Sequence, residues 1–316
     1  MEPLDFSKVL SHCALCPRQC GVNRLGGETG FCRAGKEAEV YRYAPHFGEE
    51  PPLSGTRGSG TVFFSRCTLR CLYCQNYPWS QEGAGARISA DNLAAILRKL
   101  KIQGCHNWNL VSPTPWLPMI FEALENVKAA GCSLPVIYNT SGYERVETLR
   151  ALEGMVDVYL ADLRYARESS SAACSAADDY VKNARQALLE MQRQKGPLKM
   201  SPAGTASAGV ICRILILPGL ADEASESIRW LAENIGTDLS LSVLAQYTPA
   251  YHAEKTAEMN RPISYEEYRQ VCRAVEKEGF VNGWLQDYNG PARPELAGFN
   301  MPALVPAEIR SALSFP

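Results

Sequence analysis

Cysteine is the residue type that decides which chemistry this chain of 316 residues could perform, and the chain contains 12 of them. Seven lie within the first 74 residues, in one group spaced C-x2-C-x3-C-x11-C and a second spaced C-x3-C-x2-C. The first group is Cys13, Cys16, Cys20 and Cys32, and the second is Cys67, Cys71 and Cys74.

The N-terminus carries acidic residues and no apolar run, so we expect a cytoplasmic protein without a secretory signal. Thiols stay reduced in the cytosol, which favours metal or redox chemistry over disulfides.

The second group is typical of an iron–sulfur site. Three thiolates so close together on one loop suit a cluster of iron and sulfide. Three ligands for a four-iron cluster leave one iron open, and that iron can bind a substrate or cofactor. The alternative is zinc or a set of buried free thiols, but zinc usually takes four ligands from paired C-x2-C motifs.

The elements that must position this loop begin near residue 60, where apolar runs start to alternate with amphipathic helices. Strands are expected at 61–64, 108–111, 135–138, 156–160, 210–217 and 239–244. Helices are expected near 93–100, 114–127, 144–153, 179–194 and 222–235, and a last one starts with Ser264 and Glu267 at capping-box spacing. This alternation predicts an α/β fold with parallel strands, as a partial (β/α)6 barrel with a Cys-rich N-terminal extension and a loop-rich C-terminal tail. No GxGxxG loop follows the first strand, which argues against a doubly wound sheet.

The chain divides into three expected parts. Residues 1–58 would form a Cys-rich metal-binding extension, 59–280 the barrel core, and 281–316 a C-terminal segment that wraps the body. Residues 195–208 are expected to form a mobile excursion. Composition is ordinary for a globular protein, with 46% hydrophobic and 21% charged residues. A net charge of −2 does not favour a nucleic-acid binder, and no apolar run approaches the ~20 residues of a membrane span.

Polar residues follow several of the expected strands, at the barrel end where active sites lie. Ser112 follows the second strand, Asn139 and Ser141 the third, Asp162 and Arg164 the fourth, and Gln246 the sixth. These residues could instead have purely structural roles. The alternatives are a turn with a helix cap for residues 139–142, a surface ion pair for Asp162 and Arg164, and simple packing for Tyr247. Single residues are expected to be structural: Cys212 and Cys272 in the core, and the isolated His46, His106 and His252.

The loop from Cys67 to Cys74, with Tyr73 before its last cysteine and a strand before its first, resembles the hallmark of the radical SAM superfamily. The resemblance implies a 4Fe-4S cluster held by Cys67, Cys71 and Cys74, whose open iron chelates S-adenosylmethionine. One electron then cleaves the sulfonium to methionine and a 5′-deoxyadenosyl radical, which abstracts hydrogen from the substrate. It also implies a one-electron donor such as flavodoxin or ferredoxin.

The resemblance also assigns the residues around S-adenosylmethionine. Asp162-Leu163-Arg164 is similar to the D-x-K of pyruvate formate-lyase activating enzymes, with Asp162 for the ribose hydroxyls and Arg164 for the carboxylate. Tyr73 would pack near the adenine, while Asn139 and Ser141 would help to position the cofactor. Ser112 stands where the superfamily often has a GGE-like loop, and Gln246 would line the pocket.

Nearly the whole chain, including the leader CxxCPRxCGVNRxxGxxGxC, resembles a branch labelled as pyruvate formate-lyase activating enzymes. That label implies a glycyl-radical enzyme as the substrate, and a peptide or small molecule is equally open. The leader cysteines would hold a zinc ion or a second iron–sulfur cluster. A hypothesis from another class is a non-catalytic iron–sulfur or zinc protein that carries electrons or serves as a scaffold.

Overall fold

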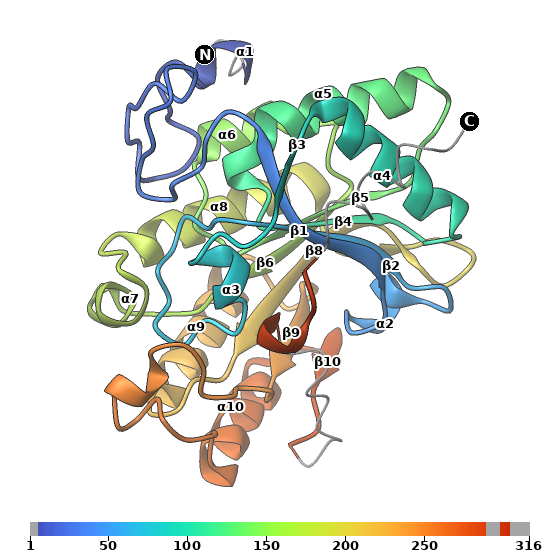
Figure 1. Ribbon diagram of the computed structural model, residues 1–316. Helices are drawn as coiled ribbons and strands as arrows, with labels where there is room; N and C mark the ends of the chain where they lie inside the picture. Colours follow the sequence, from blue (N-terminus) through green and yellow to red (C-terminus); the bar gives the residue numbers. More distant parts are fainter. Residues whose placement is uncertain (1–5, 289–297, 304–316) are drawn as a thin grey trace.

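A single sheet of ten strands positions the cysteine loop in the computed structural model, which describes residues 6–288 and 298–303 (Figure 1). The order along the sheet is β10-β9-β8-β6-β5-β4-β2-β1-β3, and β7 pairs with β8. The strands are β1 (Ala38–His46), β2 (Ser59–Phe64), β3 (Ala86–Ile88), β4 (Trp108–Val111), β5 (Val136–Thr140), β6 (Val158–Asp162), β7 (Lys199–Met200), β8 (Ala206–Leu215), β9 (Ser240–Leu244) and β10 (Gly283–Leu285).

All the helices except α1 lie between successive strands of this sheet. The helices are α1 (Phe6–Val9), α2 (Pro51–Ser54), α3 (Tyr77–Ser80), α4 (Ala90–Ile102), α5 (Leu117–Ala129), α6 (Val146–Ala151), α7 (Glu168–Ser175), α8 (Tyr180–Lys195), α9 (Ala221–Asn234) and α10 (Tyr265–Glu278). Short 3-10 turns cover Thr114–Trp116, Ala253–Lys255 and Gly298–Asn300. The capping box expected at Ser264 and Glu267 is present at the start of α10.

The α/β fold and its parallel sheet are confirmed. All six expected strands are present, as β2, β4, β5, β6, β8 and β9, and each pairs in parallel with the next. The sheet is open, because its path ends at β10 on one side and β3 on the other. Parallel pairing brings the carboxyl ends of these strands to one edge, where the polar residues were expected.

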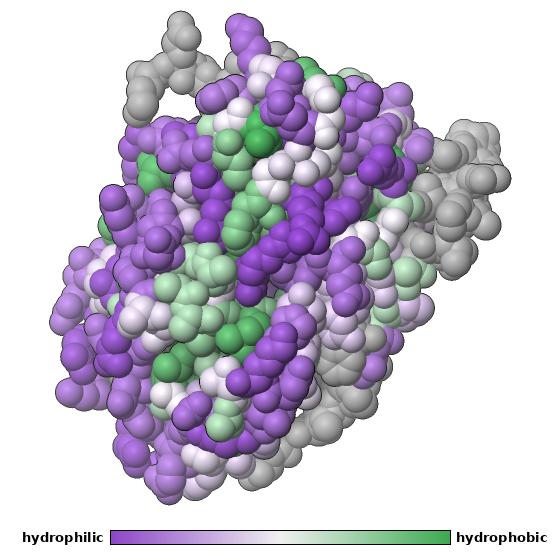
Figure 2. All heavy atoms as spheres, turned by 60° about the vertical axis from the view of Figure 1, so that its left-hand side comes forward, coloured by the Kyte–Doolittle hydropathy of each residue, from purple (hydrophilic) through white to green (hydrophobic). Residues whose placement is uncertain are grey.

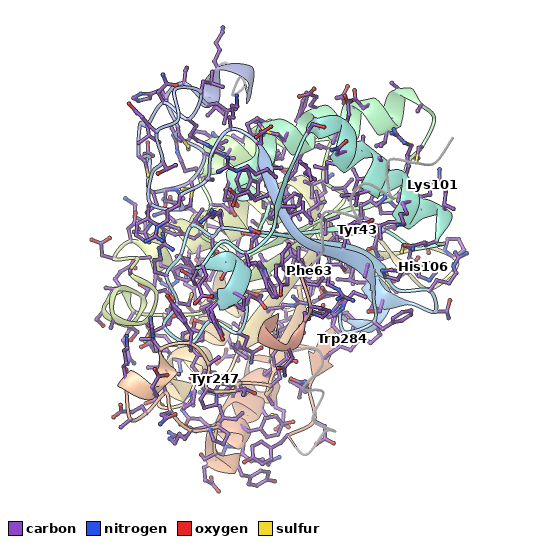
Figure 3. The ribbon with its side chains drawn as sticks, in the orientation of Figure 1. Tyr43, Phe63, Lys101, His106, Tyr247 and Trp284 are labelled. Atoms are coloured by element: carbon purple, nitrogen blue, oxygen red, sulfur yellow. The ribbon has the colours of Figure 1, made fainter. Side chains whose placement is uncertain are left out.

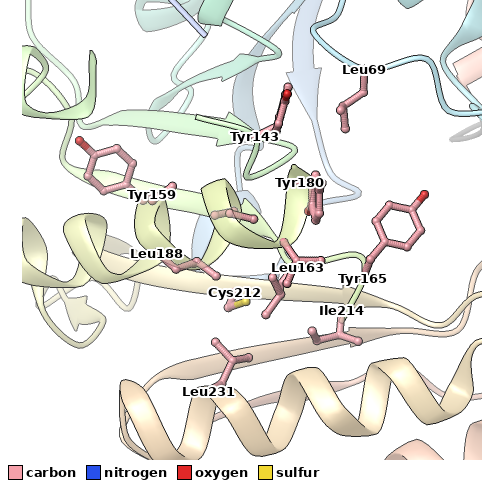
Figure 4. Close-up of a cluster of buried hydrophobic side chains, with 14 of the residues drawn as sticks. Leu69, Tyr143, Tyr159, Leu163, Tyr165, Tyr180, Leu188, Cys212, Ile214 and Leu231 are labelled. Carbon is pink, nitrogen blue, oxygen red and sulfur yellow. The ribbon is translucent and has the colours of Figure 1, made fainter. Parts of the chain in front are cut away.

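The two faces of the sheet pack against different elements, and strand residues alternate between them. On the outer face, Tyr159 and Ala161 of β6 join a core that includes Leu188 of α8 and Leu231 of α9 (Figure 4). On the inner face, Leu160 packs with Leu53 of α2. The short helix α2 therefore covers part of the inner face, while the long helices cover the outer one.

Strands β1, β7 and β10 are among the elements that lie where the sequence predicted none. Strand β1 falls inside the range 1–58 assigned to the extension, yet it pairs antiparallel with β2, so the sheet begins earlier than expected. Strand β10 falls inside the expected C-terminal segment 281–316 and pairs in parallel with β9. The excursion at 195–208 contains a short hairpin of β7 with β8. Residues 289–297 and 304–316 of the expected wrapping segment lie outside the described residues.

The face in Figure 2 is mostly hydrophilic, and its hydrophobic residues gather near the middle. Among the described residues, none of the helices combines the length and apolar character that crossing a lipid bilayer requires.

Candidate functional site

The cysteine loop leaves the sheet at the carboxyl end of β2, as the sequence predicted. The backbone turns at Arg66, which has a left-handed φ of 74°, and its side chain donates to Glu39 of β1 at 2.6 Å. The indole of Trp116 donates to the carbonyl oxygen of Ser65 at 2.7 Å. These contacts fix the point from which the three cysteines extend over the edge of the sheet.

Each of the three thiols receives its own polar contact. The backbone N–H of Leu69 lies 3.4 Å from the sulfur of Cys67, and the hydroxyl of Ser80 lies 3.1 Å from that of Cys74. Cys71 is 2% exposed, and Ser175 donates to its sulfur at 3.0 Å. Hydrogen bonds of this kind stabilise negative charge on sulfur, as metal-bound thiolates require.

The three thiols also act on one another electrostatically. Burial, together with the neighbouring charges of Cys71 and Cys74, raises the pKa of Cys67 to about 12. Burial and the charge of Cys71 likewise raise the pKa of Cys74 to about 11. Without a bound cation, Cys67 and Cys74 therefore stay protonated at neutral pH. A bound metal would supply the positive charge that deprotonates them.

Asp162 and Arg164, at the end of β6, face the cysteine loop. Their side chains form an ion pair with Nη2 of Arg164 2.6 Å from the carboxylate. The other guanidinium nitrogen, Nη1, donates to the sulfur of Cys71 at 3.1 Å. The ion pair between Asp162 and Arg164 is therefore present, and each side chain is about one-fifth exposed, so the pair is partly buried.

Residues at the ends of β4 and β5 lie beside this pair. The N–H of Ser112, which has a φ of 56°, donates to the carbonyl oxygen of Asn139. The carbonyl oxygens of Ser141 and Asp162 both accept from the hydroxyl of Tyr180, at 2.8 and 3.1 Å. The polar strand ends of β5 and β6 are therefore joined through one buried tyrosine.

Gln246 and the aromatic residues of the loop complete the expected set. Gln246 is exposed, and its carbonyl oxygen accepts from Gln75, the neighbour of Cys74. The hydroxyl of Tyr73 points into the core and contacts that of Tyr165, and its ring lies 5.9 Å from the ring of Tyr247. Tyr247 is buried and donates to a backbone carbonyl, so its packing role is confirmed.

A polar cluster that the sequence did not reveal lies on the inner face of the sheet. Arg213 of β8 forms ion pairs with Glu49 and with Glu50, the latter at 2.6 Å. The amide of Asn109 donates to Glu49 at 2.8 Å, whereas its carbonyl oxygen is buried without a partner. Two carboxylates share one guanidinium here. No local spacing signals it, because the contact between Arg213 and Glu49 spans 164 residues.

The four leader cysteines line a common cavity of about 20 Å³, close to the room that one water molecule or ion needs. Arg24 lies 3.9 Å from the sulfur of Cys13, and the N–H of Phe31 donates to Cys20 at 3.4 Å. Burial and the charge of Cys32 raise the pKa of Cys16. Within residues 6–288 and 298–303, no three His, Cys, Asp or Glu side chains are arranged around one point to hold a single ion.

The leader and the cysteine loop touch directly. Phe31, which lines the leader cavity, accepts at its carbonyl oxygen from Arg70 of the loop, and its ring lies 3.8 Å below the guanidinium of Arg18. Arg18 also donates to the carbonyl oxygen of Thr68 at 3.2 Å. The two cysteine groups therefore lie on either side of a small contact between arginine and phenylalanine side chains.

Two of the isolated histidines and two of the single cysteines have the surroundings expected of structural residues. His106 accepts from the N–H groups of Thr56 and Arg57 and lies far from Tyr247 in the view of Figure 3. Burial lowers the pKa of His46, whose ring lies edge-on to Phe63. Cys212 and Cys272 are buried in the core.

Comparisons with known proteins give distant likenesses. No family model matches the chain. The uncharacterised protein MJ0674 of Methanocaldococcus jannaschii is 29% identical over 279 residues, which cover 85% of this chain and 75% of that protein. A second uncharacterised protein of the same organism, MJ0808, is 26% identical over 168 residues, or 48% of each chain.

Solved structures resemble the fold at low identity. SuiB of Streptococcus suis, bound to S-adenosylmethionine, is 13% identical and covers 70% of this chain with a TM-score of 0.47. HydG, a maturase of the FeFe-hydrogenase, is 14% identical and covers 69% with a TM-score of 0.46. The matched region spans 48% of each of these chains, about half their length.

Proposed function

We propose that this protein is a radical SAM enzyme, which holds a 4Fe-4S cluster and S-adenosylmethionine at the carboxyl ends of its parallel strands and abstracts hydrogen from a substrate. One observation carries the proposal. Arg164 contacts the sulfur of Cys71 through Nη1 at 3.1 Å and pairs with Asp162 through Nη2 at 2.6 Å. The loop expected to hold the cluster and the residues expected to hold the cofactor thus meet at one side chain.

The thiol set fits an iron–sulfur cluster. Cys67, Cys71 and Cys74 would be its protein ligands, and each sulfur already has an N–H or O–H group within hydrogen-bond distance. A four-iron cluster distributes its ligands over several metal atoms, so the sulfurs need not converge on one point. The arrangement of these thiols is therefore compatible with a cluster although it does not form a single-ion site.

The strand-end residues fit S-adenosylmethionine by their chemistry. The Arg164 guanidinium can bind a carboxylate in a fork, and Asp162 can accept from ribose hydroxyls. Ser112, Asn139, Ser141 and Gln246 offer further hydrogen-bonding groups at neighbouring strand ends. When bound, the cluster and S-adenosylmethionine supply the one-electron cleavage that yields a hydrogen-abstracting radical. The protein residues bind, orient and exclude water.

The leader extends the proposal to a second site. We propose that Cys13, Cys16, Cys20 and Cys32 hold a metal, either a zinc ion or a second iron–sulfur cluster, because all four line one cavity. The small volume of that cavity means that the side chains must shift to admit a full cluster.

The substrate class and partners are proposed from the resemblance alone. A glycyl-radical enzyme or another peptide would be the substrate, and a flavodoxin or ferredoxin would supply the electron.

The test is formation of 5′-deoxyadenosine by anaerobic, cluster-reconstituted protein with S-adenosylmethionine and dithionite. We expect product with the wild type and at least about 100-fold less with Cys71→Ala, because loss of one ligand removes the cluster. Cys105→Ala, which changes a buried cysteine outside both groups, serves as the control. Bound iron and sulfide without product would support the non-catalytic hypothesis instead. Adding a glycyl-radical protein and recording an EPR doublet extends the same assay to that substrate class.

A further inference from the structure

A line of hydroxyl groups runs through the core and ends on the sulfur of Cys71. The hydroxyl of Tyr73 lies 2.7 Å from that of Tyr165, which lies 2.6 Å from the hydroxyl of Ser175. Ser175 in turn donates to the sulfur of Cys71 at 3.0 Å. Tyr165 and Ser175 are fully buried, and Tyr73 is 4% exposed. We call Tyr73, Tyr165 and Ser175 the hydroxyl relay.

The direction of the relay is fixed by proton counting. Each hydroxyl carries one proton, and a metal-bound thiolate can only accept. Because Ser175 gives its proton to the sulfur of Cys71, its oxygen must accept from Tyr165. Tyr165 then accepts from Tyr73. All three O–H dipoles therefore point toward the same sulfur, and bonds aligned in this way strengthen one another by roughly 10–30% each.

The backbone holds the relay in place. The carbonyl oxygens of Cys174 and Ser175, at the end of α7, accept from Leu72 and Arg70 of the cysteine loop at 2.9 and 3.0 Å. The ring of Tyr165 packs edge-on against Tyr180, at 5.3 Å between centroids, and both lie in the core shown in Figure 4. The end of α7 and the loop are thus joined by backbone hydrogen bonds, which keep the backbone of Ser175 beside the sulfur.

Cys71 therefore differs from its two partners. Its sulfur accepts from Ser175, at the head of the relay, and from the positively charged Arg164 at 3.1 Å. The sulfur of Cys67 accepts from Leu69 at 3.4 Å, and that of Cys74 contacts Ser80 at 3.1 Å and accepts from the backbone of Asn76, so neither has a charged donor in hydrogen-bond contact. Donors and positive charge around a cluster sulfur stabilise the extra negative charge of the reduced cluster.

We propose that the hydroxyl relay sets the reduction potential of the cluster by stabilising its reduced form through Cys71. This inference rests on the proposed function, since it requires a cluster at the three cysteines. Reduction adds one electron from a one-electron donor such as dithionite, and it breaks no bond and moves no proton. Ser175, Tyr165 and Tyr73 are positioning residues, because only the sulfur ligand touches the metal.

The test compares reduction potentials of reconstituted variants by EPR-monitored titration, together with their iron and sulfide content. We expect Ser175→Ala to lower the reduction potential of the cluster by about 59 mV for a one-electron couple. At the wild-type midpoint, this shift lowers the ratio of reduced to oxidised cluster about tenfold. Tyr165→Phe should shift the potential in the same direction by less, and Tyr73→Phe by least. Ser171→Ala on the same helix and Tyr159→Phe in the same core lack contact with the relay, so their potentials should match the wild type.

The outcomes separate this inference from the proposed function. An unchanged potential in Ser175→Ala with full iron content overturns the relay and leaves the radical SAM proposal intact. A wild type that assembles no cluster overturns both. If Ser175→Ala fails to assemble a cluster, Tyr165→Phe decides, because it removes one oxygen atom and keeps the ring. Equal potentials in Tyr165→Phe and wild type then reject the relay.

Discussion

Glu144 is a carboxyl group buried where water cannot reach it. It is 1% exposed, and one oxygen accepts from Thr114 at 2.6 Å and from Thr140 at 2.5 Å. The other oxygen is buried without a partner. Burial raises the pKa of Glu144 from 4.5 to about 7, although the hydroxyl contacts act in the opposite direction. The native protein therefore holds this proton more tightly than the unfolded chain does.

This residue predicts a pH dependence of stability. The protonated carboxyl of Glu144 adds to the unfolding free energy at low pH, and this contribution is lost as the pH rises from 4.5 through about 7. Over this window Glu144→Gln should gain about 3 kcal/mol of unfolding free energy relative to the wild type. Urea unfolding at pH 5 to 8 measures the difference. Glu147→Gln, at an exposed position of α6, is the control and should keep the wild-type pH dependence of the unfolding free energy. If the unfolding free energies of Glu144→Gln and the wild type change with pH in the same way, the raised pKa of Glu144 is rejected.

At the scale of elements, the contact between β5 and β6 depends on a glycine. Gly142 has a φ of 79°, and a Cβ placed there would lie 2.2 Å from the carbonyl oxygen of Asp162. The turn after β5 therefore lies directly against the end of β6, from which Asp162 and Arg164 extend. A side chain at this position would push apart the two strand ends that carry the candidate site.

The prediction is that Gly142→Ala destabilises the protein more than the same change at Gly131. Gly131 has a φ of 67° with open space around it, so alanine costs only the left-handed backbone, about 1–2 kcal/mol. At position 142 overpacking should add a further 1–3 kcal/mol. Chemical denaturation of both variants gives the comparison. Equal losses would mean that the turn after β5 can move away from β6 without cost.

At the scale of the whole molecule, the leader is bound to the body through several long-range contacts. Arg145 and Thr148 donate to the carbonyl oxygens of Ala14 and Leu15 at 2.6 and 2.8 Å. Leu15 is 2% exposed within the main core. The four-cysteine cavity is thus a rigid part of the protein, and we expect it to bind metal independently of the loop.

Metal analysis tests that independence. A variant with Cys67, Cys71 and Cys74 all changed to Ala should retain metal at the leader, whereas Cys16→Ala with Cys32→Ala should lose it and keep the iron of the loop. Cys132→Ala, outside both groups, is the control. A metal-free triple variant would mean that the leader cavity is not a metal site.

How much the sequence could predict differs between strands and side-chain contacts. The six parallel strands were predictable because each is a short apolar run buried on both faces. Strand β1 was missed because its sequence, AEVYRYAPH, contains charges and Pro45 and lies among glycines and cysteines. Its place is decided by pairing with β2, which no local pattern encodes.

The same limit applies to the site. The cysteine spacing is local, and the positions of Asp162 and Arg164 follow from strand ends meeting at one edge. Ser175 could not be found in this way, because a serine in a helix has no distinctive spacing and its contact with Cys71 spans 104 residues. Arg213 and Glu49 were missed for the same reason.

The separation of 104 residues between Cys71 and Ser175 has a consequence for biosynthesis. A ribosome adds roughly 5–20 residues per second, so Cys71 emerges about 5–20 s before Ser175. For most of this interval the thiols of the nascent chain lack both Arg164 and α7. Iron loaded at that stage would meet an open loop, so correct loading belongs after α7 has been made.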